Sequence, residues 1–398
     1  MNNRIEPDES VEVNSNTTRL RAIYEHFQKR KLIWIIFFIV VIVVIILVST
    51  ITATMNKTKK EKPSTTTTEI TPQTTKESTM EEIITSELLT TTNEPFDSSI
   101  MINNNTKWKQ NASTVAGGIT PGSELNQLNG PQGIYVDNDD HSIYIADTNN
   151  HRIVRWKFGE NNGEIVAGGN GPGPETNQLT FPADVTLDKE KKYIIICDSG
   201  NTRVMRWFRQ NSQDKQIWIP SIMCRGLVMD SNGDLYISDQ VKHEVIRWQE
   251  GNTEGIVVAG GHGEGNELNQ LNQPMYIFVD EQHSVYVADA MNNRVMKWKK
   301  NATEGTRTIN HIFFSQIQPI SVIVDQMGNA YVSMIGNPQI MRWSPGATAG
   351  VPVAGKKIEE SGPTQILMPC DLSFDRHGNL YAVDMMNGRI QKFDIDRG

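Results

Sequence analysis

The sequence predicts an all-β domain, a six-bladed β-propeller, joined through a disordered stalk to a single N-terminal transmembrane helix. Three observations predict this organisation. Six similar segments end in an aromatic residue, 41 to 51 residues apart. A stretch of 17 uncharged apolar residues occupies positions 32–48. Between that stretch and the first segment, the chain is rich in Ser, Thr and Pro.

The six segments share three anchor positions. The aromatic ends are Trp156, Trp207, Trp248, Trp298, Trp343 and Phe393. Twelve residues earlier stand Tyr144, Ile195, Tyr236, Tyr286, Tyr331 and Tyr381. Before those come Asp137, Asp188, Asp230, Asp280, Asp325 and Asp375. Because the anchors recur together, the segments are repeats of one structural unit.

Each repeat predicts four short strands. In the first copy these are "PQGIYVD", "SIYIAD" and "RIVRW", rich in β-branched and aromatic residues and bounded by Asn, Asp or Gly, followed by "IVAGG" at 165–169. An extra "TVAGG" at 114–118 precedes the first copy, and the chain stops after the third strand of the last. We therefore expect residues 112–118 to pair with 389–396 and close the ring, which removes unpaired sheet edges.

The pattern "PQGIYVD…IYIADTNNHRIVRW" resembles NHL repeats, which form six-bladed β-propellers, and the resemblance covers residues 107–398. It implies the fold much more strongly than a function. Related propellers act as enzymes, RNA readers and adhesion modules, so function depends on the site rather than on the fold.

The N-terminal part divides into three segments. Residues 1–31 are predicted to be a cytosolic tail, 32–54 a transmembrane helix, 55–106 a stalk, and 107–398 the propeller. The apolar stretch is long enough to cross a hydrocarbon core of about 30 Å. The alternative, a cleaved signal peptide, has a shorter apolar core of roughly 7–15 residues. A retained signal-anchor is therefore favoured.

Basic residues flank both sides of this helix, so the positive-inside rule barely decides its orientation. The stalk has the composition of O-glycosylated stems. N-glycosylation sequons begin at Asn56, Asn104, Asn111 and Asn301, although Asn16 heads one in the predicted cytosolic tail. These features favour a single-pass type II membrane glycoprotein with its propeller outside the cell or in a secretory lumen.

Charge and cysteines restrict the function classes. The formal net charge of −8 is opposite to the basic surface of most nucleic-acid binders, so we expect no nucleic-acid partner.

The cysteines Cys197, Cys224 and Cys370 are odd in number, which leaves at least one unpaired. All three fall within strand patterns. Cys224 and Cys370 occupy equivalent positions in repeats three and six, so we expect them not to meet and to be small buried hydrophobic residues.

An aspartate and an arginine recur five residues apart in four repeats. The pairs are Asp147/Arg152, Asp198/Arg203, Asp289/Arg294 and Asp384/Arg389. We expect each pair to join across the turn between the second and third strands, worth about 0–1 kcal/mol if exposed. The alternative is a charged ring that binds a polar ligand. The third repeat places Asp239 opposite Glu244 instead, where Lys242 or His243 is expected to compensate.

Successive side chains of the first strand in each repeat point to opposite sides. We predict that the apolar ones pack between blades and that the others face the central channel. The channel-facing set contains two carboxylates, Asp184 and Asp371, and also Tyr135, Tyr276 and Ser321. Two carboxylates across a gap suggest a Ca²⁺ site, although no cofactor is certain. The favoured alternative is that both carboxylates are solvated and accept hydrogen bonds from loop amides.

Two functions follow from these patterns. The first is a membrane-anchored recognition or adhesion module whose propeller rim binds an extracellular protein, peptide or glycan. The second is a metal-dependent lyase or hydrolase in the channel, similar to the peptide-amidating lyase, a six-bladed relative that holds zinc through histidines. No predicted channel position is a histidine, because His141, His151, His243, His262, His283 and His377 fall in turns and loops. The sequence therefore favours recognition and assigns no catalytic residue.

Overall fold

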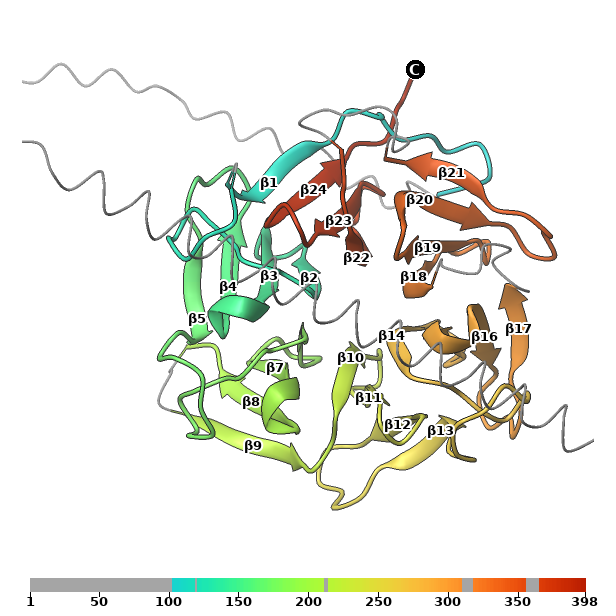
Figure 1. Ribbon diagram of the computed structural model, residues 1–398, viewed down its shortest axis with the longest axis horizontal. Coiled ribbons are helices and arrows are strands. Elements are labelled where there is room, and N and C mark those ends of the chain that lie inside the picture. Colours follow the sequence, from blue (N-terminus) through green and yellow to red (C-terminus); the bar gives the residue numbers. More distant parts are fainter. Residues whose placement is uncertain (1–101, 119, 211–213, 310–317, 356–364) are drawn as a thin grey trace, which may run out of the picture. The chain divides into compact units, whose positions relative to one another are not determined.

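Six four-stranded antiparallel sheets stand in a ring around a central axis (Figure 1). The computed structural model describes residues 102–118, 120–210, 214–309, 318–355 and 365–398. The predicted cytosolic tail, transmembrane helix and most of the stalk lie outside these residues. In the part that is described, no helix is both long and apolar enough to span a bilayer.

Each blade runs from an inner to an outer strand. Blade one contains β2 (Ile134–Asp137), β3 (Ser142–Asp147), β4 (Arg152–Lys157) and β5 (Glu164–Gly168). Blade two contains β6 (Asp184–Leu187), β7 (Tyr193–Asp198), β8 (Arg203–Phe208) and β9 (Lys215–Pro220). Blade three contains β10 (Cys224–Met229), β11 (Leu235–Asp239), β12 (Glu244–Trp248) and β13 (Ile256–Gly260).

The second half of the ring follows the same plan. Blade four contains β14 (Pro274–Val279), β15 (Val285–Asp289), β16 (Arg294–Trp298) and β17 (Thr306–Ile309). Blade five contains β18 (Pro319–Val324), β19 (Ala330–Met334), β20 (Asn337–Trp343) and β21 (Val351–Ala354). Blade six contains β22 (Pro369–Phe374), β23 (Leu380–Asp384), β24 (Arg389–Phe393) and β1 (Ser113–Gly117). Single-turn 3₁₀ helices occupy Thr148–Asn150, Ser199–Asn201 and Ala290–Asn292.

The predicted ring closure is confirmed. β1 pairs antiparallel with β24, with Gly117 opposite Arg389 and Ser113 opposite Lys392 (Figure 1). Trp108 fixes the segment that leads into β1, because its buried indole donates a hydrogen bond to the Gly378 carbonyl at 2.9 Å. Blade six is therefore built from both ends of the domain.

Apolar clusters fill the seams between neighbouring blades. Between blades one and two, for example, Tyr144 and Ile153 pack with Val185, Ile196 and Met205. Every repeat thus buries its sheet faces against its neighbours, which explains why one large closed domain can exceed the usual size of a single core.

The prediction about the inner strands needs correction. Tyr135 packs against the apolar cluster of blade two, whereas Ile134 and Val136 pack in the cluster shared with blade six. Alternate side chains of an inner strand therefore pack against the next blade and against the previous blade. Because the sheets are arranged around the axis, neighbouring blades cover both faces of each inner strand.

The two rims of the ring differ in their connections. On what we call the upper rim, each inner strand begins and the chain turns between the second and third strands. Hydrogen bonds join these parts, as from the Gly200 amide to the Thr180 carbonyl and from the Met385 amide to the Met368 carbonyl. The turns between first and second strands lie on the lower rim.

Candidate functional site

The third residue of each inner segment, counted from its proline or equivalent position, forms what we call the central belt. Its members are Gly133, Asp184, Gly226, Tyr276, Ser321 and Asp371. All lie near the start of the inner strands and are buried. The belt contains four of the five residues that the sequence proposes as ligand-binding, while Tyr135 lies outside it.

Asp184 links blade two to blade three. Its Oδ2 accepts a hydrogen bond from the Leu227 amide at 2.7 Å, and its Oδ1 accepts one from the Val185 amide at 2.8 Å. Glycine is required beside it, because a Cβ on Gly133 would lie 2.2 Å from Asp184 Oδ1. The carboxylate therefore occupies space that a side chain in blade one would otherwise fill.

Asp371 has the corresponding role between blades six and one. Its Oδ2 accepts from the Ile134 amide at 3.0 Å, and its Oδ1 accepts from the Leu372 amide at 2.8 Å. The Ser321 hydroxyl of blade five also donates to Oδ1 at 2.9 Å. Asp371 thus joins three consecutive blades through one side chain.

Tyr276 crosses the middle of the belt. Its hydroxyl donates a hydrogen bond to the Ala183 carbonyl of blade two at 2.9 Å, although Tyr276 itself belongs to blade four. The Arg225 guanidinium carbon lies 5.7 Å from the centre of the Tyr276 ring, a cation–π distance. Blades that are not neighbours are therefore bridged by an aromatic side chain.

The environment of the belt disfavours ionisation. Burial, reinforced by the charge of Asp371, raises the pKa of Asp184 well above its ordinary value. Burial raises the pKa of Asp371 to about 6, against the opposing effect of the hydrogen bond from the Ile134 amide. Burial likewise raises the pKa of the Tyr276 hydroxyl. The two carboxylates thus share a desolvated centre in which full charge is costly.

The expectation that both aspartates are solvated is wrong. Their side chains are buried and accept hydrogen bonds from strand amides rather than loop amides. Across the described residues, no group of three His, Cys, Asp or Glu side chains is arranged to hold a metal ion. A Ca²⁺ ion needs six to eight oxygen ligands. The geometry favours hydrogen bonding between blades, and calcium binding stays a prediction.

The Asp–Arg pairs across the hairpins are confirmed. Their Nε–Oδ2 distances are 2.7 Å for Arg152–Asp147, 2.7 Å for Arg203–Asp198, 2.6 Å for Arg294–Asp289 and 2.9 Å for Arg389–Asp384. The pairs are buried, apart from the partly buried Arg389, so the 0–1 kcal/mol of an exposed pair does not apply to them. In blade one, the Arg152 guanidinium also binds carbonyls of the incoming loop, including that of Gln127 at 3.0 Å. The pairs hold the connecting loops and do not form an open charged ring.

Blade three replaces this pair as the sequence indicates. Asp239 lies opposite Glu244 in the strand register, and its Oδ1 accepts from the Lys242 amide at 3.0 Å. Burial raises the pKa of Glu244, while the charge of Lys242 lowers it. His243 uses Nδ1 to accept a hydrogen bond from the Gln273 amide and therefore supports the loop into blade four.

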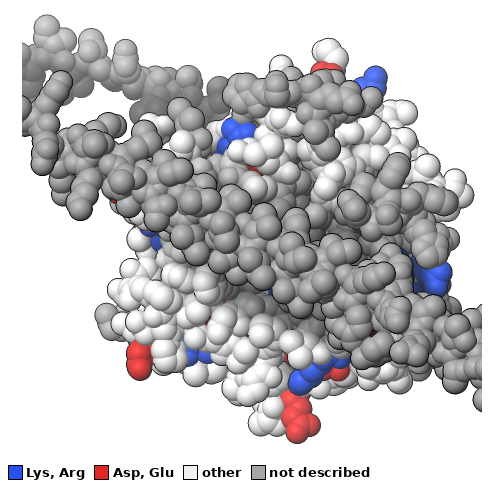
Figure 2. Space-filling view, in the orientation of Figure 1, with Lys and Arg blue, Asp and Glu red and all other residues white. Residues whose placement is uncertain are grey.

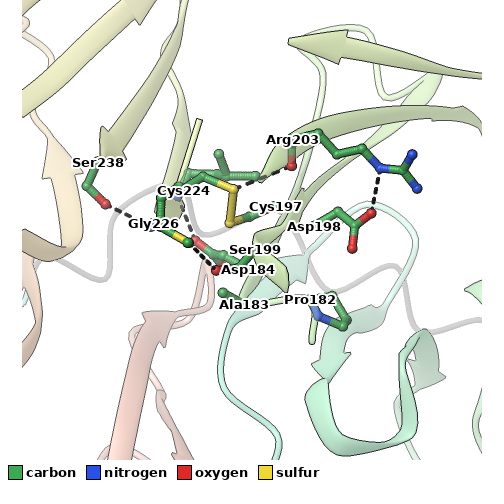
Figure 3. The surroundings of a disulfide bond; sticks show 12 residues. Pro182, Ala183, Asp184, Cys197, Asp198, Ser199, Arg203, Cys224, Gly226 and Ser238 are labelled. Atoms are coloured by element: carbon green, nitrogen blue, oxygen red, sulfur yellow. Dashed lines mark hydrogen bonds and ion pairs between the residues drawn. A yellow bond between two sulfur atoms is a disulfide. The ribbon is translucent and has the colours of Figure 1, made fainter. Parts of the chain in front are cut away.

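The cysteines differ from expectation in one respect. Cys197 of β7 and Cys224 of β10 form a disulfide that joins blades two and three, next to Asp184 (Figure 3). Cys370 is free and buried, as the odd number of cysteines requires. Cys197 and Cys224 meet because a second strand in one blade packs against the first strand of the next, a contact that spacing alone does not reveal.

The upper rim exposes apolar side chains around the belt. Val241, Met291 and Met386 occupy the turns between second and third strands, with exposed fractions of 63%, 47% and 60%. Phe181 and Leu367 precede inner strands and are about half exposed. The described surface visible in Figure 2 is mostly uncharged, with its charged side chains scattered rather than gathered. These five exposed side chains make the upper rim a candidate surface for a partner.

Of the predicted glycosylation sites, Asn104, Asn111 and Asn301 lie on the described surface, and all three are exposed. Asn56 lies outside the described residues. Exposure is necessary for glycosylation, so these three positions are compatible with the prediction.

A family model for the NHL repeat matches residues 128–156. No curated protein sequence matches the chain. Among solved structures, an auxiliary nutrient binding protein from Bacteroides thetaiotaomicron is 13% identical, with a TM-score of 0.57 over 73% of this chain and 78% of that one. A gluconolactonase from Xanthomonas campestris is 12% identical, with a TM-score of 0.52 over 72% and 99%.

A virginiamycin B lyase from Staphylococcus aureus is similar in fold, with 12% identity and a TM-score of 0.50 over 73% of this chain and all of that one. At such low identity these structures share the fold alone. The repeat match and the closed ring of six blades agree with each other: the chain carries an NHL repeat at residues 128–156 and folds as a six-bladed β-propeller.

Proposed function

We propose that this protein is a recognition module, in which the upper rim of a membrane-anchored propeller binds a partner protein or peptide. The observation that carries the proposal is the exposure of Val241, Met291 and Met386 around a buried centre. Exposed apolar groups that gather on one face are typical of interaction sites. Methionine suits such a surface because its flexible thioether adapts to different shapes.

The buried belt supports binding on the rim over chemistry in the channel. Asp184, Tyr276 and Asp371 use their polar atoms to join blades, and each is less than one-tenth exposed. A substrate in the channel would have to displace these bonds. A partner on the rim leaves them intact.

The disulfide between Cys197 and Cys224 supports a propeller outside the cytosol, because disulfides persist in oxidising compartments. The exposed sequons at Asn104, Asn111 and Asn301 point the same way. Together with the apolar stretch at 32–54, they support a type II membrane orientation. Sensitivity of the full-length protein to an N-glycosidase, lost when Asn56, Asn104, Asn111 and Asn301 are all replaced by Gln, would test this placement.

Recognition itself is tested by extracellular proximity labelling with the full-length protein on intact cells. Met386→Glu should remove specific labelled partners, because a charge would have to be buried in the apolar contact. Met327→Glu is the matched control, since Met327 is 46% exposed in a lower-rim turn. A role for the upper rim would be refuted if wild type and Met386→Glu labelled the same partners, or if Met327→Glu lost as many labelled partners as Met386→Glu.

A channel enzyme is the second candidate, and one observation favours it. The pKa of Asp371, raised to about 6 by burial, lies in the range useful for acid–base catalysis. The gluconolactonase and lyase relatives lend little weight, because they share only the fold. Stoichiometric metal in the purified protein that disappears in Asp184→Ala and Asp371→Ala would support this candidate against recognition.

A further inference from the structure

A cleft on the outer perimeter lies between blades three and four. Its cavity volume is about 430 Å³. The outermost strand of blade three, β13, supplies one wall through Ile256 and Val257. The turn between β16 and β17 supplies the other through Lys299 and Lys300, and Arg247 also lines the cleft.

The edge of β13 is unlike the other five outermost strands. The others carry polar, charged or proline residues: Ser113 and Thr114 in β1, Glu164 in β5, Lys215 and Gln216 in β9, Thr306 and Arg307 in β17, and Pro352 in β21. Such residues discourage another chain from adding to a sheet edge. β13 reads Ile-Val-Val-Ala-Gly and has none of them. Ile256 and Val257 are 49% and 47% exposed.

The cleft is also positively charged. Its described ionisable lining residues are Tyr236, Arg247, His262, His283, Lys299 and Lys300, with no carboxylate among them. Lys299 and Lys300 form no ion pair with any described residue. The whole chain, by contrast, is acidic, with a net charge of −8. The positive charge is therefore a local property of this cleft.

The arginine in the cleft is weakly compensated. Arg155, its counterpart in blade one, lies 2.6 Å from Asp140. Arg247 approaches Asp234 only to 3.7 Å, and its buried Nε has no hydrogen-bond partner among the described residues. Asp234 instead accepts hydrogen bonds from Gln249 at 3.1 and 3.2 Å. Asp234 therefore offsets the charge of Arg247 only in part, and the guanidinium adds to the positive charge of the cleft.

We propose that β13 and this cleft bind an acidic peptide segment in an extended conformation. The peptide backbone pairs with the free edge of β13, its aliphatic side chains cover Ile256 and Val257, and its carboxylates bind Lys299 and Lys300. A second copy of this chain fits less well at the same edge. Pairing of two β13 strands would bring the lysines of both copies together, which like-charge repulsion opposes.

The test uses purified full-length protein in detergent and a fluorescein-labelled octapeptide of alternating Glu and Val, titrated by fluorescence anisotropy. Val257→Lys should weaken binding about tenfold or more, and Lys299→Glu/Lys300→Glu by a similar factor. The matched controls are Ile165→Lys at the corresponding position of β5 and Lys157→Glu, which follows Trp156 as Lys299 follows Trp298. Both controls should bind like wild type. Higher salt should weaken binding by wild type.

Several outcomes would overturn the proposal. One is equal binding of a Lys–Val octapeptide, which would remove the role of charge. Another is loss of binding in Ile165→Lys equal to that in Val257→Lys, which would show that any outer strand suffices. Concentration-dependent dimerisation abolished by Val257→Lys would identify a second copy as the occupant. Binding of a sulfated oligosaccharide that displaces the peptide and is insensitive to Val257→Lys would identify an anion site without strand pairing.

Discussion

The buried pair Asp289–Arg294 offers the sharpest test of how the loops are held. Arg294 Nε lies 2.6 Å from Asp289 Oδ2, and the arginine side chain is 4% exposed. Its two Nη atoms donate to the carbonyls of Asn266, Glu267 and Gln270 at 2.6 to 3.0 Å. Arg294→Gln would remove the cation and most of these bonds while leaving a fully buried carboxylate.

Breaking a buried pair from one side costs about 3–5 kcal/mol. Blade five lacks both charges: by sequence Met334 and Gln339 stand at the two positions, although a shorter turn places Asn337 opposite Met334 in the strand register. The double variant Asp289→Met/Arg294→Gln carries the same two residue types. We expect the double variant to lose about 2 kcal/mol less unfolding free energy than the two single variants lose together, since no charge is left buried alone.

Urea denaturation of the purified protein, followed by tryptophan fluorescence, measures each free energy of unfolding. Lys192→Gln is the control, because its ion pair with Glu190 is solvent-exposed and its loss should change nothing measurable. Strict additivity of the two substitutions, or a cost below about 1 kcal/mol for Arg294→Gln, would refute this account of the pair.

Three further predictions concern the ring. Because the pKa of Asp371 is raised to about 6 in the folded protein, its contribution to stability is present below about pH 4 and is lost as the pH rises through 6; denaturation at several pH values should show a smaller slope in Asp371→Asn than in wild type, because the raised pKa of Asp184 still contributes. Replacing Cys197 and Cys224 by Ala should lower the free energy of unfolding by about 2–4 kcal/mol, whereas a reductant should destabilise wild type without affecting the variant. Trp108→Ala should cost about 3–5 kcal/mol, and faster hydrogen exchange in β1 than in β5 would show that closure is the step affected.

Local sequence patterns were sufficient to predict the blades. The recurring Asp, Tyr and Trp positions and the β-branched runs specify strands and turns, and the surplus "TVAGG" strand predicts closure, which β1 and β24 confirm. The pairing of Asp147 with Arg152 was also predictable, because both residues flank one short turn.

Contacts between blades were not predictable in the same way. Whether Asp184 meets water or the Leu227 amide depends on how closely neighbouring inner strands approach, and no local pattern encodes that distance. The same holds for the disulfide between Cys197 and Cys224, which lie in different blades. Glycine at 133, next to Asp184, and at 226, next to the Tyr276 backbone, was the available signal. It marks positions where a residue in one repeat needs space in another.

The pairing of β1 with β24 also sets an order of events during synthesis. Among the described strands β1 leaves the ribosome first, yet the strand it needs spans Arg389–Phe393 and emerges last. Until then the nascent chain holds an unpaired edge at each end, where chaperones or a second nascent chain can bind. A chain that terminates before Arg389 leaves both edges permanently open, so premature termination should direct the product toward degradation rather than folding.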